Sequence, residues 1–518
     1  MAAQFHNAMG VYEPVRTEDA YGDVEKASPD PKAGSPRADE GGADVEAAGR
    51  ASDSRSASRR GGSGGESERR LRLVSLDVFR GLSVVLMIFV DHAGGFFPAI
   101  NHSPWDGLTL ADYVMPFFLF IVGVSLGLVY KKMSSRASAT RKVLLRALKL
   151  LLLGLFLQGG YFHGVGSLNY GVDIDQMRFM GILQRIAIAF LVAALCEIWL
   201  KGDDDVNSGI SLLKKYRSQW AVVLVLTAVY ISLLYGLYVP DWEYQIPTES
   251  PSLSQERILV KCGVRGNTEP ACNAVAMIDR QVLGIRHLYR KPAYLRTKQC
   301  SIHSPDSGPL PADAPSWCQA PFDPEGLLSS VMAVVTCLVG LQFGHVIVHF
   351  KDHGVRTFHW MISSSFLVAL GLALDLLGMH VNKALYTCSY MAVTAGVAGI
   401  LFTLIYLMVD FGGLRRTTTV LEWIGRNALT VYVLAATNVL PVFLQGFYWR
   451  RPENNIVCFP PSVILFQPQN VTPLSDKLAE SITLSMAAEF NRNQKMIESP
   501  ISCFDSEYLL EQLATYIY

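Results

Sequence analysis

The sequence lacks an excess of charge of either sign. Its 518 residues include 45 lysines and arginines against 45 aspartates and glutamates, and charged residues make up only 17% of the chain. A zero net charge gives no general attraction to nucleic acid. Half of the residues are hydrophobic and the mean hydropathy is +0.25, which argues against a purely soluble enzyme and suits a multi-pass membrane protein.

The motifs of common cofactor and metal sites are also missing. We find no P-loop, no dinucleotide-binding fingerprint, no metalloprotease motif and no CxxC-type zinc spacing. The sequence therefore predicts no metal site.

Residues 1–70 contain few large apolar side chains and are rich in Ala, Gly, Ser, Arg, Asp and Glu. Such a segment buries too little surface to offset its ordering entropy, so we expect a disordered, cytosolic N-terminal region. It has no apolar run of the kind that defines a secretory signal, which leaves targeting to the first membrane span. A transit peptide is a weaker alternative because acidic residues occur from Glu18 onward. No decisive organelle address is visible.

What the sequence does contain is a series of long apolar stretches. A membrane-spanning helix needs about 20 mostly apolar residues. Nine stretches qualify, at 74–91, 113–130, 143–162, 179–200, 220–239, 327–349, 357–377, 385–409 and 420–447. The sequence therefore predicts an all-α membrane protein, a polytopic bundle of about nine transmembrane helices. Gly123 with Gly127, and Gly340 with Gly344, have the spacing that permits close helix approach.

Basic residues precede the first stretch and lie in every second connection between the stretches. They are Arg69, Arg70, Arg72, Lys131, Lys132, Arg136, Arg141, Lys142, Lys214, Lys215, Arg217, Lys351, Arg356, Arg415 and Arg416. By the positive-inside rule these connections face the cytosol together with the N-terminus. The 92–112 loop, the 163–178 loop and the long 240–326 segment then face outward or into a lumen.

The cysteines agree with this topology. Four of the nine, Cys262, Cys272, Cys300 and Cys318, fall in the long 240–326 segment. In an oxidising compartment an even set indicates two disulfides, with three possible pairings that the sequence does not separate. Four free thiols are the alternative. The remaining cysteines inside spans, Cys196, Cys337 and Cys388, are predicted to be packing residues.

We divide the chain into the 1–70 region, a transmembrane domain at 71–456 that includes the lumenal loop 240–326, and a non-spanning tail at 457–518. Leu474, Leu478, Ile482, Met486 and Phe490 recur every four residues, which predicts one short amphipathic helix in the tail. An odd number of spans would place this tail in the lumen, where Asn470 would be a glycosylation acceptor.

Ionisable residues gather at one predicted membrane edge, after the first span. Asp91, His92, His102, Asp106 and Asp112 lie within a short stretch. Since an ionisable group at membrane depth costs about 2.5–3.5 kcal/mol, such a group suggests function. A neutral imidazole can take a proton from an amine or hydroxyl, or accept an acyl group itself, and a carboxylate can orient the ring. A single loop histidine is more often structural, but the surrounding carboxylates favour catalysis.

Other charged residues within spans are less specific. Asp77 and Arg80 share a helix face and are expected either to pair as an anchor or to hold a phosphate-bearing cofactor. Gln184 and Arg185 could bind an anionic ligand or pair with helix ends. The same alternatives hold for Arg146, Lys149, Glu422, Arg426 and Asn427.

An ordered series of motifs resembles one family of transmembrane enzymes. The motifs are Leu76–Ser83, Asn101–Asp112, Pro116–Gly123, Gly181–Arg185, Asp323–Leu328 and Trp423–Tyr432. They are similar to those of the heparan-α-glucosaminide N-acetyltransferase family, over roughly residues 72–456. The C-terminus is atypical: the family continues with further helices after the Pro-Glu-Asn-Asn region, whereas this sequence runs into Cys458-Phe-Pro-Pro.

The resemblance implies an acyltransferase that moves acetyl from cytosolic acetyl-CoA to the amine of a lumenal terminal glucosamine or related amino sugar, in a lysosomal or vacuolar membrane. It implies that His102 is the active-site histidine, as general base or acetyl carrier. Asp91 stands where the family has an active-site asparagine and is expected to be the partner of His102. Arg80, Gln184 and Arg185 are weaker candidates for binding acetyl-CoA, and a homodimer is also expected.

Three alternatives remain open at this point. Many spans with interior charges also suit a solute transporter or permease. An O-acyltransferase acting on a polysaccharide would need the same base. The atypical C-terminus also allows an inactive truncated isoform.

Overall fold

The computed structural model describes residues 73–131, 135–158, 177–245 and 257–437, except for 95, 96, 98, 203 and 290. Several expectations lie outside these ranges. They concern the disordered N-terminal region, most of the 163–178 loop, the amphipathic tail helix and the glycosylation acceptor Asn470. All of the helices described below fall in one compact unit.

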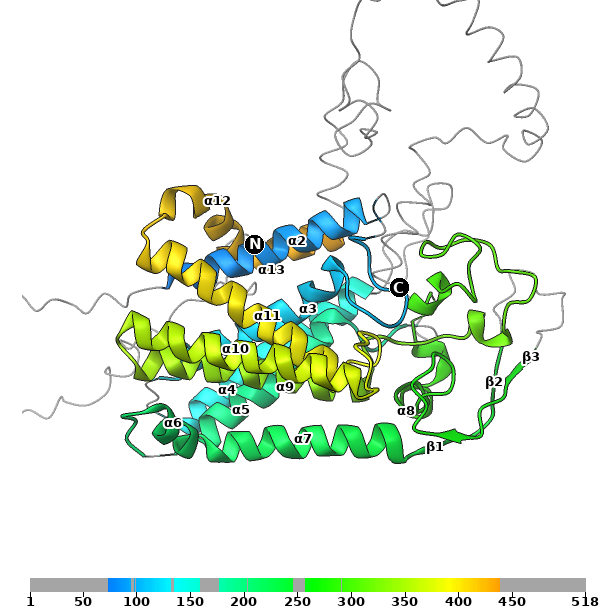
Figure 1. Cartoon of the computed structure of the whole chain (residues 1–518), viewed down its shortest axis with the longest axis horizontal. Helices are drawn as coiled ribbons and strands as arrows, with labels where there is room; N and C mark the ends of the chain where they lie inside the picture. The colour runs from blue at the N-terminus through cyan, green and yellow to red at the C-terminus, as the bar shows by residue number, and fades with distance from the viewer. Residues whose placement is uncertain are drawn as a thin grey trace, which may run out of the picture. The chain divides into compact units, whose positions relative to one another are not determined.

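Helices dominate the described chain, as the sequence predicts (Figure 1). The long ones are α2 (Val74–Ala93), α3 (Val114–Val129), α4 (Arg136–Gln158), α5 (Ile182–Trp199), α7 (Arg217–Gly236), α9 (Leu327–His349), α10 (His353–Leu376) and α11 (Cys388–Tyr406). The shorter ones are α6 (Gly209–Lys215), α8 (Ala274–Val282), α12 (Arg415–Arg426) and α13 (Ala428–Ala436). Each predicted span contains one of these helices or part of one.

Six segments of the described chain are long and apolar enough to cross a membrane: Leu110–Val129, Ile182–Trp199, Arg217–Gly236, Leu327–His349, His353–Leu376 and Cys388–Phe411. The chain is therefore a multi-pass membrane protein, but the predicted count of nine is not confirmed. Helix α2 has three charged residues (Asp77, Arg80 and Asp91), and α4 has several basic ones. The ninth stretch is interrupted at Asn427, which lies between α12 and α13.

The centre of the bundle is the contact between α3 and α9. A Cβ atom on Gly123 would overlap the carbonyl oxygen of Cys337, and one on Gly340 would overlap that of Phe120. The two backbones therefore touch where the sequence places its small residues, which confirms the predicted packing role. These two helices are also the most buried of the candidate spans, at 72% and 83% of their apolar windows.

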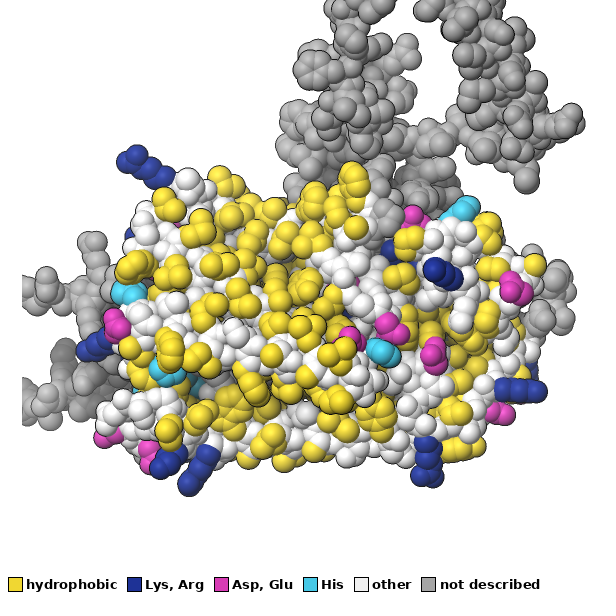
Figure 2. All heavy atoms as spheres, viewed as in Figure 1, with side chains coloured by type: hydrophobic (Ala, Val, Ile, Leu, Met, Phe, Trp, Pro, Cys, Tyr) yellow, Lys and Arg dark blue, Asp and Glu magenta, His cyan; other side chains and the backbone are white. Residues whose placement is uncertain are grey.

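Helices α7 and α10 form the outside of the bundle, since only 17% of each apolar window is buried. Leu224 and Phe366 are 69% and 63% exposed on these helices. Figure 2 shows hydrophobic side chains across the middle of one face of the molecule, with charged side chains toward its two ends. This distribution is what a bilayer requires of a protein surface.

The segment that the sequence predicts to be lumenal folds beyond one end of the helices (Figure 1). Strand β1 (Tyr238–Val239) pairs with β4 (Val264–Arg265), and β2 (Trp242–Gln245) pairs with β3 (Arg257–Val260), both antiparallel. We call this end of the bundle the lumenal end and the opposite one the cytosolic end, following the prediction from flanking charges.

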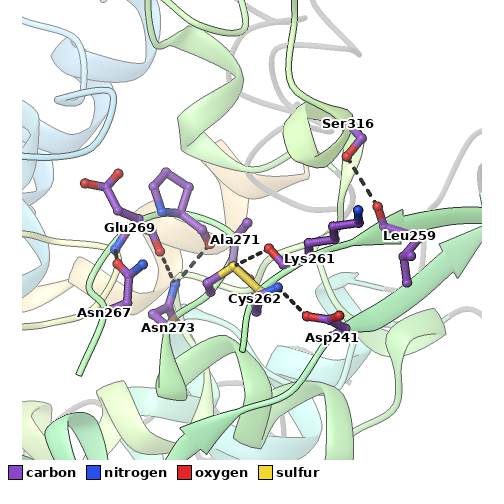
Figure 3. Close-up of a disulfide and its surroundings, with 11 residues drawn as sticks. Asp241, Leu259, Lys261, Cys262, Asn267, Glu269, Ala271, Asn273 and Ser316 are labelled. Carbon is purple, nitrogen blue, oxygen red and sulfur yellow. Dashed lines mark hydrogen bonds between the residues drawn. A yellow bond between two sulfur atoms is a disulfide. The ribbon is translucent and has the colours of Figure 1, made fainter. Parts of the chain in front are cut away.

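Two disulfides hold this segment, as predicted, and the structure selects one of the three pairings. Cys262 is joined to Cys272 and Cys300 to Cys318. Beside the first, the backbone N–H of Cys262 donates to the carboxylate of Asp241 at 2.6 Å (Figure 3). The cysteines inside spans, Cys196, Cys337 and Cys388, are free and buried, in agreement with a packing role.

Candidate active site

The site forms where two lumenal connections meet. The first joins α2 to a short 3-10 helix, η2 (Leu110–Tyr113), and the second joins α10 to α11. Gly107 N–H donates to the carbonyl of Val381 at 2.8 Å, and the Asn382 side chain donates to Asp106 at 3.1 Å. Residues more than 270 positions apart in sequence thus share one surface.

His102 and Asp112 form the best-defined pair at this surface. Nδ1 of His102 lies 2.7 Å from Oδ1 of Asp112. The other carboxylate oxygen accepts hydrogen bonds from the backbone and hydroxyl of Thr109, both at 3.0 Å, and from the backbone of Ser103 at 3.2 Å. Because Asp112 is fully buried and held by three donors besides the ring, it fixes the orientation of the imidazole.

This arrangement determines the tautomer of a neutral His102 ring. The proton stays on Nδ1 and is donated to Asp112, so the lone pair is on Nε2. The His102 side chain is 17% exposed, whereas that of Asp112 is 0% exposed. The pair therefore has an oriented base at the edge of the protein and a buried carboxylate behind it. A catalytic histidine is oriented by its carboxylate partner in the same way.

Lys383, from the α10–α11 connection, lies against the same ring. Its Nζ is 2.8 Å from Nδ1 and 3.1 Å from Nε2 of His102, and 3.7 Å from Oδ1 of Asp112. An atom in the ring plane cannot be so close to both nitrogens without overlapping the carbon between them. The ammonium therefore lies over the face of the imidazole.

Further charges surround this cluster. Burial lowers the pKa of His102 most, Lys383 and Arg296 lower it further, and Asp112 opposes them. Burial also lowers the pKa of Lys383, against the influence of Asp112, Glu325 and Asp91, while Arg185 lowers it further. The site is thus a compact set of opposite charges rather than an isolated pair.

The predicted partner, Asp91, lies in the last turn of α2 and is half-buried. Its charge acts on Lys383, which places it in the neighbourhood of the cluster. The His102 ring itself contacts Asp112 and Lys383. Of His92 only the backbone, in α2, belongs to the described part of the chain.

Gln184 and Arg185 begin α5 at the lumenal end and are both buried. Arg185 donates to the carbonyl of Pro324 at 2.7 Å and to the hydroxyl of Ser330 at 3.3 Å, and it lies over the Tyr386 ring at 5.3 Å. Since Tyr386 is three residues from Lys383, Arg185 lies beside the cluster and ties α5 to the start of α9.

Arg80 lies at the other end of α2. Asp91 lies eleven positions further along the helix, which is roughly 16 Å along its axis. The Arg80 guanidinium pairs with Asp77 at 3.2 Å, as the spacing predicts, and also donates to Ser125 at 3.3 Å and to the Gly425 carbonyl at 3.4 Å. These contacts join α2, α3 and α12 and favour the anchoring role.

Lys383 and Arg296 were not among the candidates from the sequence. Arg296 donates to the side chain of Asn101 at 3.1 Å, and the same oxygen accepts the His102 backbone N–H at 2.7 Å. A signal in the sequence is that Lys383 is a basic residue in a short connection on the side where the positive-inside rule expects few such residues. Within the described ranges no group of three or more side chains could hold a metal ion.

Comparisons with known proteins agree with the motifs. Residues 72–202, which include Asp91, His102, Asp112 and Arg185, match the family described as heparan-alpha-glucosaminide N-acetyltransferase, catalytic. The mouse heparan-alpha-glucosaminide N-acetyltransferase is 29% identical over 388 residues, which cover 71% of this chain and 53% of the relative. The human protein of the same name is 29% identical over 405 residues, covering 74% and 55%. The chain thus spans about half the length of the curated relatives it matches.

Proposed function

From its confirmed resemblance to the heparan-α-glucosaminide N-acetyltransferase family, we propose that this chain is a transmembrane N-acetyltransferase. Its donor is acetyl-CoA from the cytosol, and its acceptor is the amine of a terminal glucosamine or related amino sugar in a lumen. A lysosomal or vacuolar membrane and a homodimer follow from the same resemblance and are part of the proposal.

The observation that carries the proposal is the His102–Asp112 pair at 2.7 Å, at the lumenal end of a membrane-spanning bundle and within the segment matched by the catalytic family. A thioester already carries an activated acyl group. The protein therefore needs mainly to position the two substrates, to provide one base and to stabilise the oxyanion.

In a direct transfer, the amine nitrogen attacks the thioester carbonyl while Nε2 of His102 accepts the proton that the amine loses. The new C–N bond forms, the C–S bond breaks, and the imidazolium returns the proton to the leaving thiolate. Alternatively, Nε2 itself attacks, releases the thiolate and holds the acetyl group until the amine takes it. Asp112 orients the ring in both routes, and Asp91 is the further acidic partner that we propose.

Arg185 and Gln184 are the better placed of the proposed donor-binding residues, because Arg185 lies beside the cluster and both lie at the same end of α5. Arg80 remains a proposed contact for the donor at the cytosolic end, although its described contacts favour an anchor. A cytosolic donor would then have to reach from one end of the bundle to the other.

Two rivals use the same features. An O-acyltransferase would need the same oriented base and differs only in the acceptor, so glucosamine and a sugar with hydroxyls alone separate the two. A permease would move substrate without forming an acetylated product.

The test uses the full chain in detergent with labelled acetyl-CoA and glucosamine. His102→Ala should abolish formation of labelled N-acetylglucosamine. His380→Ala is the matched control, since His380 is a histidine of the same lumenal connection as Lys383 with 62% of its side chain exposed. Undiminished acetylation by His102→Ala would remove this imidazole from the mechanism.

A further inference from the structure

The position of Lys383 needs an explanation that acetyl transfer alone does not provide. A base benefits from a carboxylate partner, yet the ammonium of Lys383 lies over the ring of His102 and beside Asp112. Such a charge opposes protonation of the imidazole. Four-fifths of the lysine side chain is buried, which strengthens the interaction.

We infer that Lys383 is a positioning residue that keeps His102 uncharged in an acidic compartment, with its proton on Nδ1 and its lone pair on Nε2. The inference rests on the proposed function, in which Nε2 is the reacting atom. Without the ammonium, the buried negative charge of Asp112 would favour an imidazolium, and an imidazolium can neither accept a proton nor attack a thioester.

The charges that face His102 from each neighbouring element support this balance. Asp112 of η2 favours the imidazolium, whereas Lys383 of the α10–α11 connection and Arg296 of η5 (Ala293–Arg296) disfavour it. Burial lowers the pKa of His102 most, and the two cations lower it further, so that together they outweigh Asp112.

Acidic groups from several elements act in turn on the charge of Lys383. Asp112, Glu325 before α9 and Asp91 of α2 all favour its charged form, while Arg185 of α5 opposes it. The acidic residue at position 91 thus has a role in this balance: it favours the ammonium and thereby acts on the imidazole through Lys383.

The experiment follows the protonation of His102 in two ways. The first is the pH profile of acetyl transfer by the full chain, for the wild type, Lys383→Met and Lys383→Arg. The second is the pH dependence of carbethoxylation of His102 by diethyl pyrocarbonate, read by mass spectrometry of the peptide that contains it. This reagent modifies only the neutral ring, and the readout does not require catalysis.

We expect Lys383→Met to move the acidic limb of the activity profile, and the midpoint of His102 modification, upward by one pH unit or more. Activity below that limb would then fall about tenfold or more, with little change at alkaline pH. Lys383→Arg retains the charge and should keep both midpoints near those of the wild type. A purely structural role would lower activity equally at all pH values and leave the midpoints in place.

Three results decide the matter. Unchanged midpoints in Lys383→Met would overturn the inference even if His102 proves essential for transfer. A shifted modification midpoint in a protein that transfers no acetyl group would keep the electrostatic role and reject the proposed function. If Lys383→Met does not fold, Lys383→Gln replaces it with the same expected upward shift of both midpoints. An unchanged His102 midpoint in Lys383→Gln would then overturn the inference.

Discussion

Two histidine–carboxylate pairs with the same separation occupy opposite ends of this molecule. At the lumenal end His102 lies 2.7 Å from Asp112, and toward the cytosolic end His345 of α9 lies 2.7 Å from Glu197 of α5. The surroundings differ. His345 and Glu197 are each only 1% exposed, Gln342 lies 3.2 Å from Nδ1 of His345, and Tyr216 stacks on the ring with centroids 3.5 Å apart.

This difference teaches that distance alone does not identify a catalytic pair. Both ring nitrogens of His345 are engaged with side chains, and the ring is enclosed by helices, so the pair holds α5 against α9. His102 lies in a connection between helices and is partly exposed, and its ring also contacts the ammonium of Lys383. We therefore propose chemistry for the lumenal pair and helix packing for the other.

The largest effect is expected from a variant that breaks the lumenal His102–Asp112 pair. Asp112→Asn should lower kcat by about 10²–10⁴-fold, because the amide no longer favours the tautomer with the lone pair on Nε2. The melting temperature should change much less than activity, since the amide can still accept hydrogen bonds from Thr109 and Ser103. The assay is acetyl transfer to glucosamine, with a thermal melt of the same preparation.

The counterpart variant, Glu197→Ala, should show the opposite pattern. Removing one partner of a buried pair costs about 3–5 kcal/mol, so the melting temperature should fall while kcat of the remaining folded protein is kept. If Glu197→Ala removed activity without loss of stability, the assignment of the two pairs would be reversed.

Much of the fold could be predicted from the sequence, because long apolar runs and flanking charges are local properties. The close approach of α3 and α9 was visible in the glycine spacing. The interruption at Asn427 was not, since apolar residues continue on both sides of it and hydropathy does not report a break. Disulfide pairing also depended on the folded arrangement of the lumenal segment.

The arrangement of the candidate site could be predicted only in part. His102 stood out through neighbouring ionisable residues and the family motif, and Asp112 belonged to the same short stretch. What the sequence could not show is that η2 turns the Asp112 carboxylate onto Nδ1, or that residue 383 lies over the ring. Both depend on which lumenal connections meet, and this is set by the packing of helices far apart in sequence.

The next effect concerns the pH dependence of stability at the lumenal end. The pKa of Asp279 is raised to about 7, mainly by burial and also by Asp323, against the hydrogen bond that the Leu327 N–H donates to Oδ1 at 2.8 Å and the charges of Arg185 and Arg280. Oδ2 is buried and has no hydrogen-bond partner within the described chain. The folded state therefore binds a proton that the unfolded state releases above its ordinary pKa of 3.8.

It follows that ionisation of Asp279 lowers the free energy of unfolding as the pH rises from about 4 to 7. The total loss is about 4 kcal/mol at most, and below about pH 4 there is none. Asp279→Asn keeps the acceptor at Oδ1 but does not titrate. Thermal melts from pH 4 to 8 should thus show the wild type losing stability relative to Asp279→Asn as pH rises. Parallel curves would contradict this assignment.

The smallest effect is expected at the cytosolic end, from replacing Arg80. If Arg80 is mainly an anchor between α2, α3 and α12, Arg80→Met should cost about 1 kcal/mol of stability and leave the KM for acetyl-CoA unchanged. Thermal melts and initial rates at varied acetyl-CoA provide both values. A rise in KM without loss of stability would instead support a donor contact at this end.

The most direct test of the central claim is a sidedness measurement in sealed vesicles that contain the full chain in one orientation. Labelled acetyl-CoA is supplied only on the side of the basic connections, and glucosamine only on the side of His102. The account predicts labelled N-acetylglucosamine on the His102 side, and none with His102→Ala. Product that forms only when both substrates share the side of the basic connections would contradict it.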